Sequence, residues 1–91
     1  PEHRPDFART LQLYPNPATT RLTAQFQSLA NVQGKAVLRD VLGSVVAVQN
    51  WDIITGANNF EWDVAHLSEG TYFLEWSDDR EVAVARFVIT R

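Results

Sequence analysis

Three side chains in one short segment could in principle form a hydrolytic triad: Asp63, His66 and Ser68. Such hydrolases combine a serine nucleophile with a histidine base and a carboxylate that orients the histidine. Neighbours within a single turn, however, seldom converge on a substrate. The only other histidine, His3, lies far away near the N-terminus. We therefore predict that the chain has no catalytic residues and is not an enzyme.

A second group offers oxygen ligands for a metal ion: Asp78, Asp79 and Glu81. The segment lacks the loop spacing with which calcium sites arrange their ligands, so we interpret it as a solvated turn. The chain contains no cysteine, which excludes disulfides, thiolate zinc sites and cysteine nucleophiles. The sequence therefore predicts no metal site and no cofactor.

Three tryptophans suggest a different chemistry, because exposed indole rings can stack on sugars. Trp62 and Trp76 are in phase with the apolar residues of their segments, which favours packing in a core. Trp51 lies between Asn50 and Asp52 near the end of an apolar segment and is the candidate for an exposed ring. A carbohydrate-binding or adhesion β-sandwich module of a secreted protein is therefore the alternative function.

Length and composition exclude several classes of protein. The chain has 91 residues, of which 45% are hydrophobic and 21% charged, so it has room for one folded domain with one core. This balance excludes a disordered tail and a coiled coil. Eight basic and eleven acidic residues give a net charge of −3, so there is no basic surface for nucleic acid. No apolar run is long enough to span a membrane.

The elements that position these side chains are predicted to be strands. Apolar and polar residues alternate along segments such as 22–26 and 60–64, a period that indicates strands with one buried face. Short connections favour antiparallel neighbours. We therefore predict an all-β fold, a single immunoglobulin-like antiparallel β-sandwich of about seven strands. The predicted strands cover residues 11–14, 21–27, 35–40, 44–53, 58–64, 70–77 and 80–90.

Turn residues separate these strands. Pro15 and Pro17 cannot donate to a ladder, so the first strand is expected to end before them and the chain to change direction around Asn16. Asp40 and Gly43 suit the two ends of a tight hairpin turn. Further turns are predicted at Gly56 with Asn58 and Asn59, and at Asp78 with Asp79.

One local pattern predicts a specific hydrogen bond. Leu67 and Gly70 precede Tyr72 at the start of a predicted strand, as in the tyrosine corner of Greek-key sandwiches. In that corner the ring packs in the core and the hydroxyl bonds to backbone a few residues upstream. We expect Tyr72 to do the same.

Taken together and in this order, these blocks resemble the type A C-terminal sorting domain of the type IX (Por) secretion system of Bacteroidetes. The resemblance covers about residues 11–91 and rests on a Pro-Asn-Pro turn near the start combined with an apolar and basic strand at the end. The chain differs at Arg39, where the family often has an aromatic or apolar residue, and at Arg91, where many members have a lysine-containing tail. The matching residues are 13–18, Leu22, 40–43, Gly56, Asn59, 67–74 and 85–91.

The resemblance implies a non-catalytic signal that directs an N-terminal cargo through the periplasm and across the outer membrane, to the cell surface or the medium. Its implied partners are the type IX translocon and a sortase-like surface protease that cleaves upstream of the domain. Residues 1–10, with two prolines and little apolar pattern, are expected to be a linker remnant. Residues 11–91 are expected to form the sorting domain.

Two groups of residues carry these expectations. The terminal strand is the candidate for direct contact with the machinery, by strand addition if it lies at a sheet edge. Changes there are expected to spare stability and abolish export, and an unpaired edge would also permit a homodimer. The candidate contact residues are Arg86, Phe87, Val88 and Arg91. The motif residues, expected to act through folding, are Pro15, Asn16, Pro17, Asp40, Gly43, Gly70 and Tyr72.

Overall fold

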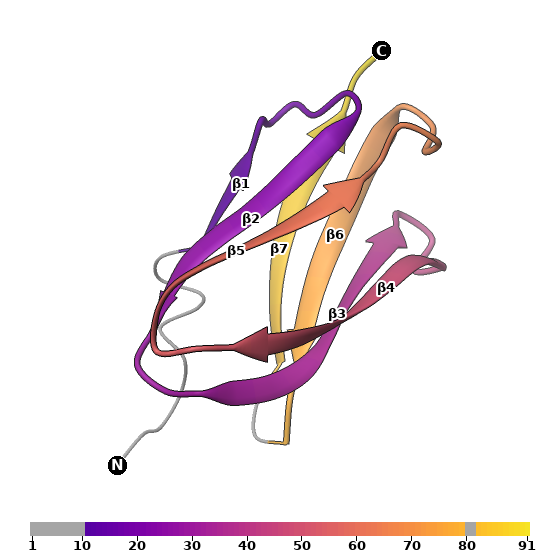
Figure 1. Cartoon of the computed structure of the whole chain (residues 1–91). Coiled ribbons are helices and arrows are strands. Elements are labelled where there is room, and N and C mark those ends of the chain that lie inside the picture. The colour runs from indigo at the N-terminus through magenta and orange to yellow at the C-terminus, as the bar shows by residue number, and fades with distance from the viewer. Residues whose placement is uncertain (1–10, 80–81) are drawn as a thin grey trace.

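The computed structural model describes residues 11–79 and 82–91, and this part of the chain forms seven antiparallel strands in two sheets (Figure 1). The three-stranded sheet has the order β1-β2-β5 and the four-stranded sheet the order β4-β3-β6-β7. The predicted all-β antiparallel sandwich is therefore confirmed. The strands are β1 Gln12–Tyr14, β2 Arg21–Ser28, β3 Val32–Asp40, β4 Val45–Ile53, β5 Gly56–Asp63, β6 Gly70–Ser77 and β7 Val82–Ile89. The expected linker at residues 1–10, with His3, and also Glu81 lie outside the described residues.

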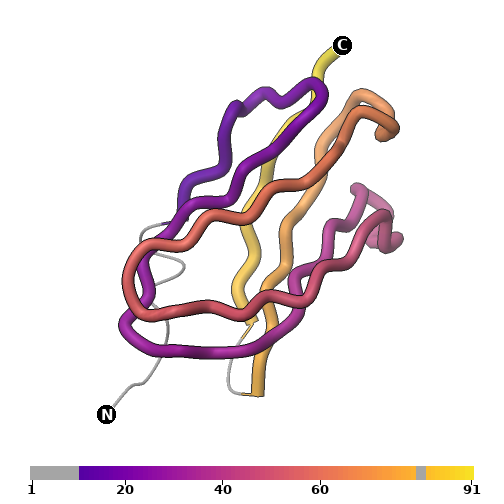
Figure 2. The backbone as a smooth tube through the Cα atoms, in the orientation of Figure 1, coloured from indigo at the N-terminus to yellow at the C-terminus, as the bar shows by residue number. Residues whose placement is uncertain are grey.

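The path of the chain resembles that of immunoglobulin-type sandwiches with one difference. In constant-type immunoglobulin domains the fourth strand belongs to the sheet of the first two strands. Here β4 lies beside β3 in the four-stranded sheet, and the chain returns to the three-stranded sheet after β4, at the β4–β5 connection (Figure 2). Strands β4 and β7 form the two edges of the four-stranded sheet.

Two strands begin earlier than the sequence pattern predicts. β3 starts at Val32 and not at residue 35, because Gln33 and Gly34 pair with β4, and this pairing overrides the low strand propensity of glycine. β5 starts at Gly56 and not at residue 58. The turn predicted at Gly56, Asn58 and Asn59 is displaced, since all three lie in β5. The Asn58 side chain instead closes the preceding turn, because it bonds to both the N–H and the carbonyl of Ile54 at 3.0 and 2.9 Å.

The core between the sheets is centred on Trp51, which is only 1% exposed. Its ring stacks on Phe60 at a centroid distance of 4.3 Å and lies 5.7 Å from both Phe26 and Trp76. The indole N–H donates to the Gln49 side chain at 2.9 Å, which satisfies its one polar group. The expectation of an exposed Trp51 is therefore wrong, because its polar neighbours occupy the opposite face of the strand.

Gly34 allows the indole rings to pack this closely. It pairs with Trp51 across β3 and β4. A Cβ atom at this position would lie 2.3 Å from Cη2 of Trp76 and 2.4 Å from the carbonyl oxygen of Ser77. The site therefore requires a residue without a side chain.

Candidate functional site

The three residues considered for catalysis do not assemble into a site. Asp63, His66 and Ser68 are all exposed, and no hydrogen bond links their side chains in the described part of the chain. The Asp63 carboxylate instead accepts the N–H of Ala65 at 3.0 Å within the turn. Among the described residues, no three His, Cys, Asp or Glu side chains are close enough together to bind a metal ion.

All three tryptophans are buried, so the flat stacking surface that a sugar would need is not formed by them. Trp62 and Trp76 pack in the core as predicted, and Trp51 joins them there. The alternative of a carbohydrate-binding module thereby loses the residues on which it was based.

The Pro-Asn-Pro turn connects the two sheets. β1 ends at Tyr14 as predicted, and the peptide bonds before Pro15 and Pro17 are both cis. The turn then brings Asn16 to β7, where its side-chain oxygen accepts the N–H of Val88 at 3.1 Å. Two residues later Ala18 donates to the Val88 carbonyl at 2.8 Å. The opening motif and the last strand thus form one structural unit.

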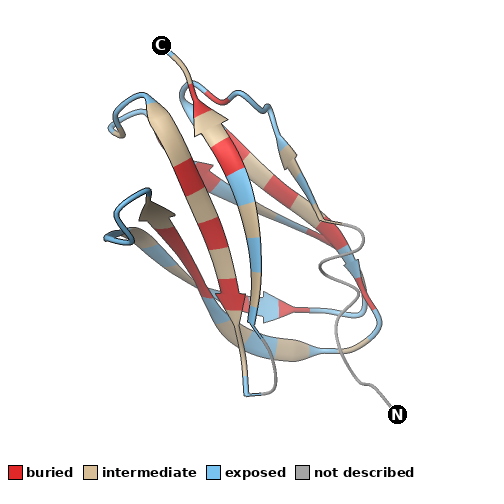
Figure 3. Ribbon diagram, turned by 180° about the vertical axis from the view of Figure 1, so that it is seen from behind, coloured by how far each residue is buried: buried red, intermediate tan, exposed pale blue. Residues whose placement is uncertain are grey.

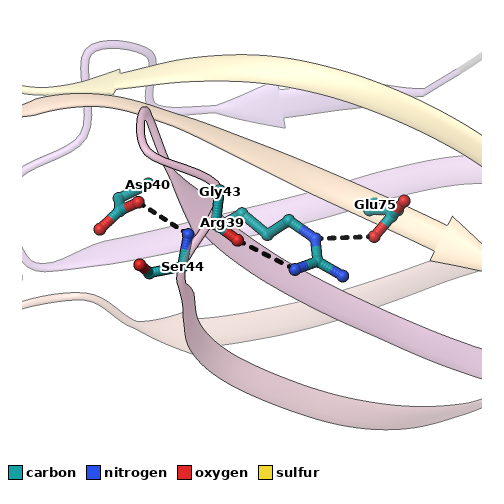
Figure 4. A network of polar contacts seen from close by, with 5 residues as sticks. All are labelled: Arg39, Asp40, Gly43, Ser44 and Glu75. Atoms are coloured by element: carbon teal, nitrogen blue, oxygen red, sulfur yellow. Dashed lines mark hydrogen bonds and ion pairs between the residues drawn. The ribbon is translucent and has the colours of Figure 1, made fainter.

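The hairpin between β3 and β4 is closed by Asp40 as predicted (Figure 4). Its carboxylate accepts the N–H groups of Leu42 and Ser44 at 2.9 and 3.0 Å, and its carbonyl accepts that of Gly43 at 3.0 Å. Gly43 has a φ of +87°, a conformation that glycine adopts without strain.

Arg39 supports the same hairpin and was not identified from the sequence, where it stood out only as a departure from the family pattern. Its Nε donates to the Glu75 carboxylate at 2.9 Å, and its Nη1 donates to the Gly43 carbonyl at 3.0 Å (Figure 4). The side chain therefore joins the hairpin to β6. A long-range contact of this kind leaves no local sequence signal.

Tyr72 forms the predicted corner. Its ring is buried and stacks on Phe87 at a centroid distance of 5.7 Å, while its hydroxyl donates to the Ser68 carbonyl at 2.6 Å. Gly70 begins β6 and pairs with Ile89 of β7. The corner therefore positions β6 and, through Phe87, the terminal strand.

The terminal strand lies at the edge of the four-stranded sheet, as strand-addition recognition would require. Its residues alternate between the core and the outer face, and buried bands are visible along the strand that leads to the C-terminus (Figure 3). Phe87 and Ile89 are both 0% exposed, whereas Arg86 is exposed and Val88 is half-buried. The expectation that changes in this strand spare stability is therefore wrong for Phe87, and it can apply only to the outward-facing residues.

Arg91 folds back on the domain. Its guanidinium donates to the carbonyl of Val64 at 2.9 Å and to that of Ala65 at 3.2 Å, and it also contacts the carbonyls of Thr19 and Leu67. These carbonyls belong to the loops that precede β2 and β6. The charge of Arg91 is thus engaged within the domain, and Arg86 is the basic residue of β7 that points outward.

No helix in the described part of the chain is long and apolar enough to cross a membrane.

Comparison with known proteins agrees with the features of the fold described above. A search of curated proteins found no match. The family model of secretion system C-terminal sorting domains matches residues 12–90, which is nearly the whole described fold and includes both the Pro-Asn-Pro turn and the terminal strand. The chain therefore belongs to the family of type IX secretion system C-terminal sorting domains, which act as sorting signals for export.

Proposed function

We propose that this domain directs a larger cargo protein, joined to its N-terminus, across the outer membrane through the type IX translocon. The cargo then reaches the cell surface or the medium, and a sortase-like surface protease cleaves the chain within or before residues 1–10. The domain itself performs no chemistry in this scheme. The proposal rests on the family match over residues 12–90.

One structural observation supports a signal read from the folded domain rather than from a short peptide. The opening turn and the last strand are far apart in sequence, yet Asn16 and Ala18 both bond to Val88. The family's defining blocks therefore meet only when the sandwich has folded. A receptor that recognises them together would recognise the folded state.

Strand β7 is the proposed contact surface for the machinery. Phe87 is buried, and Arg91 is bound to backbone carbonyls. The residues of the strand that contact the machinery are therefore the outward-facing ones, which include Arg86 and Val88. The buried positions then contribute indirectly, by holding the strand in place.

The test is an export assay with a fluorescent cargo carrying residues 1–91 at its C-terminus, in a bacterium with an active type IX system. The same cargo without the domain is the control. We expect surface or medium fluorescence only with the domain, and mass spectrometry of the exported cargo should place its new C-terminus at or before residue 10. Retention of the intact fusion in the periplasm, with the domain folded, would overturn the proposal.

A further inference from the structure

Hydrogen bonds at Val88 define which backbone groups of β7 face away from the sheet. Its N–H and its carbonyl both bond to residues 16–18, on the side opposite β6. In a strand, the N–H and the carbonyl of one residue point to the same side, and that side alternates along the chain. The backbone groups of Val82, Val84 and Arg86 therefore also face away from β6, toward the open edge.

The described residues cover only part of this edge. Ala18 forms a parallel bridge with Ile89, and its carbonyl accepts the N–H of Thr90 at 3.0 Å. No described residue bonds to the outward groups at residues 82–86. The edge thus already accepts one added extended segment, and the described part of the chain leaves the stretch before that segment open.

The open stretch lacks most of the features that usually protect a sheet edge. Charged side chains, lysine above all, and also proline, a bulge or an inward-pointing charge commonly prevent an edge strand from pairing with another chain. Residues 82–85 contain none of these, Arg86 is the one charged side chain of the stretch, and the register between β6 and β7 is regular. Val82 and Val84 are 61% and 59% exposed. A regular and largely apolar edge of this kind favours the addition of another strand.

Arg86 adds a positive charge at one end of the open stretch. It is exposed and forms no ion pair with any residue of the described ranges. Arg39, by contrast, is paired with Glu75, and Arg91 is bound to backbone carbonyls. The open edge therefore combines two exposed valines with backbone groups and one cation that have no partner among the described residues.

We propose that an extended segment of the secretion apparatus adds to the four-stranded sheet beside residues 82–86 and places a carboxylate against Arg86. This inference rests on the proposed function and specifies its mode of recognition. A second copy of the chain is a poorer match, because the outward-facing side chains of its own open stretch are Val82, Val84 and Arg86. None of these supplies the carboxylate.

A proline at position 84 tests the backbone part of the proposal. Val84→Pro removes an outward N–H without removing a bond to β6, and proline is tolerated at edge positions of this kind. Val84→Thr is the matched control, since it keeps the N–H and the branched side chain. We expect the proline variant to reduce export of the fluorescent fusion about tenfold or more, while the threonine variant stays close to the original level. Circular dichroism establishes that each variant is folded.

Val82→Pro provides a second proline variant at the first position of the strand, where it disturbs folding least. Arg86→Glu and Arg86→Lys test the charge without altering the backbone. Because Arg86 has no ion-pair partner within the described domain, both substitutions should shift the melting temperature by no more than about 2 °C. We expect the glutamate variant to lose most export and the lysine variant to retain it.

The outcomes separate this inference from the proposed function. If the original fusion is not exported, the proposed function fails and the mode of recognition fails with it. If the original fusion is exported and a folded proline variant is exported equally well, strand addition is overturned while the proposed function stands. If neither proline variant folds, the Arg86→Glu variant decides. Unchanged export of this variant overturns the proposal, and lost export supports it. If sedimentation shows a dimer that Val84→Pro dissociates while export continues, the edge serves a second copy instead.

Discussion

The side-chain oxygen of Asn16 accepts a hydrogen bond from the backbone N–H of Val88 at 3.1 Å, across 72 positions of sequence. This bond joins the turn that opens the domain to the strand that closes it. Because Ala18 bonds to the same residue of β7, the Pro-Asn-Pro motif is a structural attachment for the terminal strand. Damage to the motif should therefore appear first as a loss of stability.

Replacing Asn16 tests this attachment. Asn16→Ala should lower the free energy of unfolding by about 0.5–1 kcal/mol, the lower part of the range for one hydrogen bond, because water can reach the freed N–H. Asn16→Asp keeps an acceptor oxygen in place and should lose less. Urea unfolding of the two variants measures the difference. Equal stability of the alanine variant and the original domain would show that the bond contributes nothing.

Removing one hydroxyl tests the tyrosine corner. Tyr72→Phe keeps the ring that stacks on Phe87 but deletes the bond to the Ser68 carbonyl. We expect a loss of about 0.5–1.5 kcal/mol in the free energy of unfolding, the usual net contribution of such a bond. Thermal unfolding monitored by circular dichroism provides the measurement, and an unchanged midpoint would contradict the assignment.

Adding one methyl group tests the packing at Gly34. Gly34→Ala would place a carbon within 2.3 Å of Trp76, so the indole or the strand must move. Overpacking of this kind typically costs about 1–3 kcal/mol, and the near-ultraviolet dichroism of the tryptophans should change. Gly43→Ala is the contrasting variant, because nothing lies within 4 Å of the added carbon there and only the positive φ is unfavourable. It should destabilise the domain without altering the tryptophan signal.

The role of Arg91 can be separated from recognition by measuring stability and export together. Arg91→Ala removes several hydrogen bonds to loop carbonyls and should lower the free energy of unfolding by about 1 kcal/mol, since the site is partly exposed to solvent. The stability of Arg91→Lys should lie between that of the original domain and that of Arg91→Ala, because an ammonium group reaches fewer carbonyls at once than a guanidinium group. Lost export at unchanged stability would instead make Arg91 a direct contact of the machinery.

Tryptophan fluorescence tests the alternative function. All three indoles are buried, so we expect emission at short wavelength that shifts to longer wavelength only on unfolding. Added oligosaccharides should leave the spectrum unchanged. A sugar-dependent change in the emission of the folded domain would restore the carbohydrate-binding hypothesis.

Much of this fold could be predicted from local pattern. Two-residue alternation located every strand, and the turn chemistry of Asp40 and the spacing before Tyr72 predicted hydrogen bonds that the structure contains. Trp51 is the exception, because its polar neighbours suggest a strand end and an exposed ring. The same alternation, continued through Asn50 and Asp52, places the indole in the core.

Other features could not be predicted because they depend on how the two sheets pack. The contacts of Asn16 with Val88, of Arg39 with Glu75 and of Arg91 with the loop carbonyls all join distant segments. Each polar side chain has many possible partners in the sequence. Only the packed sandwich selects one of them.

The most direct test of the central claim compares export in two isogenic bacteria, one with an active type IX translocon and one without it. Both express a fluorescent cargo fused to residues 1–91, and proteolysis or circular dichroism of the fusion establishes that the domain is folded in each. We expect fluorescence at the surface or in the medium of the first strain and retention in the periplasm of the second. Periplasmic retention of the folded fusion in both strains would contradict the account.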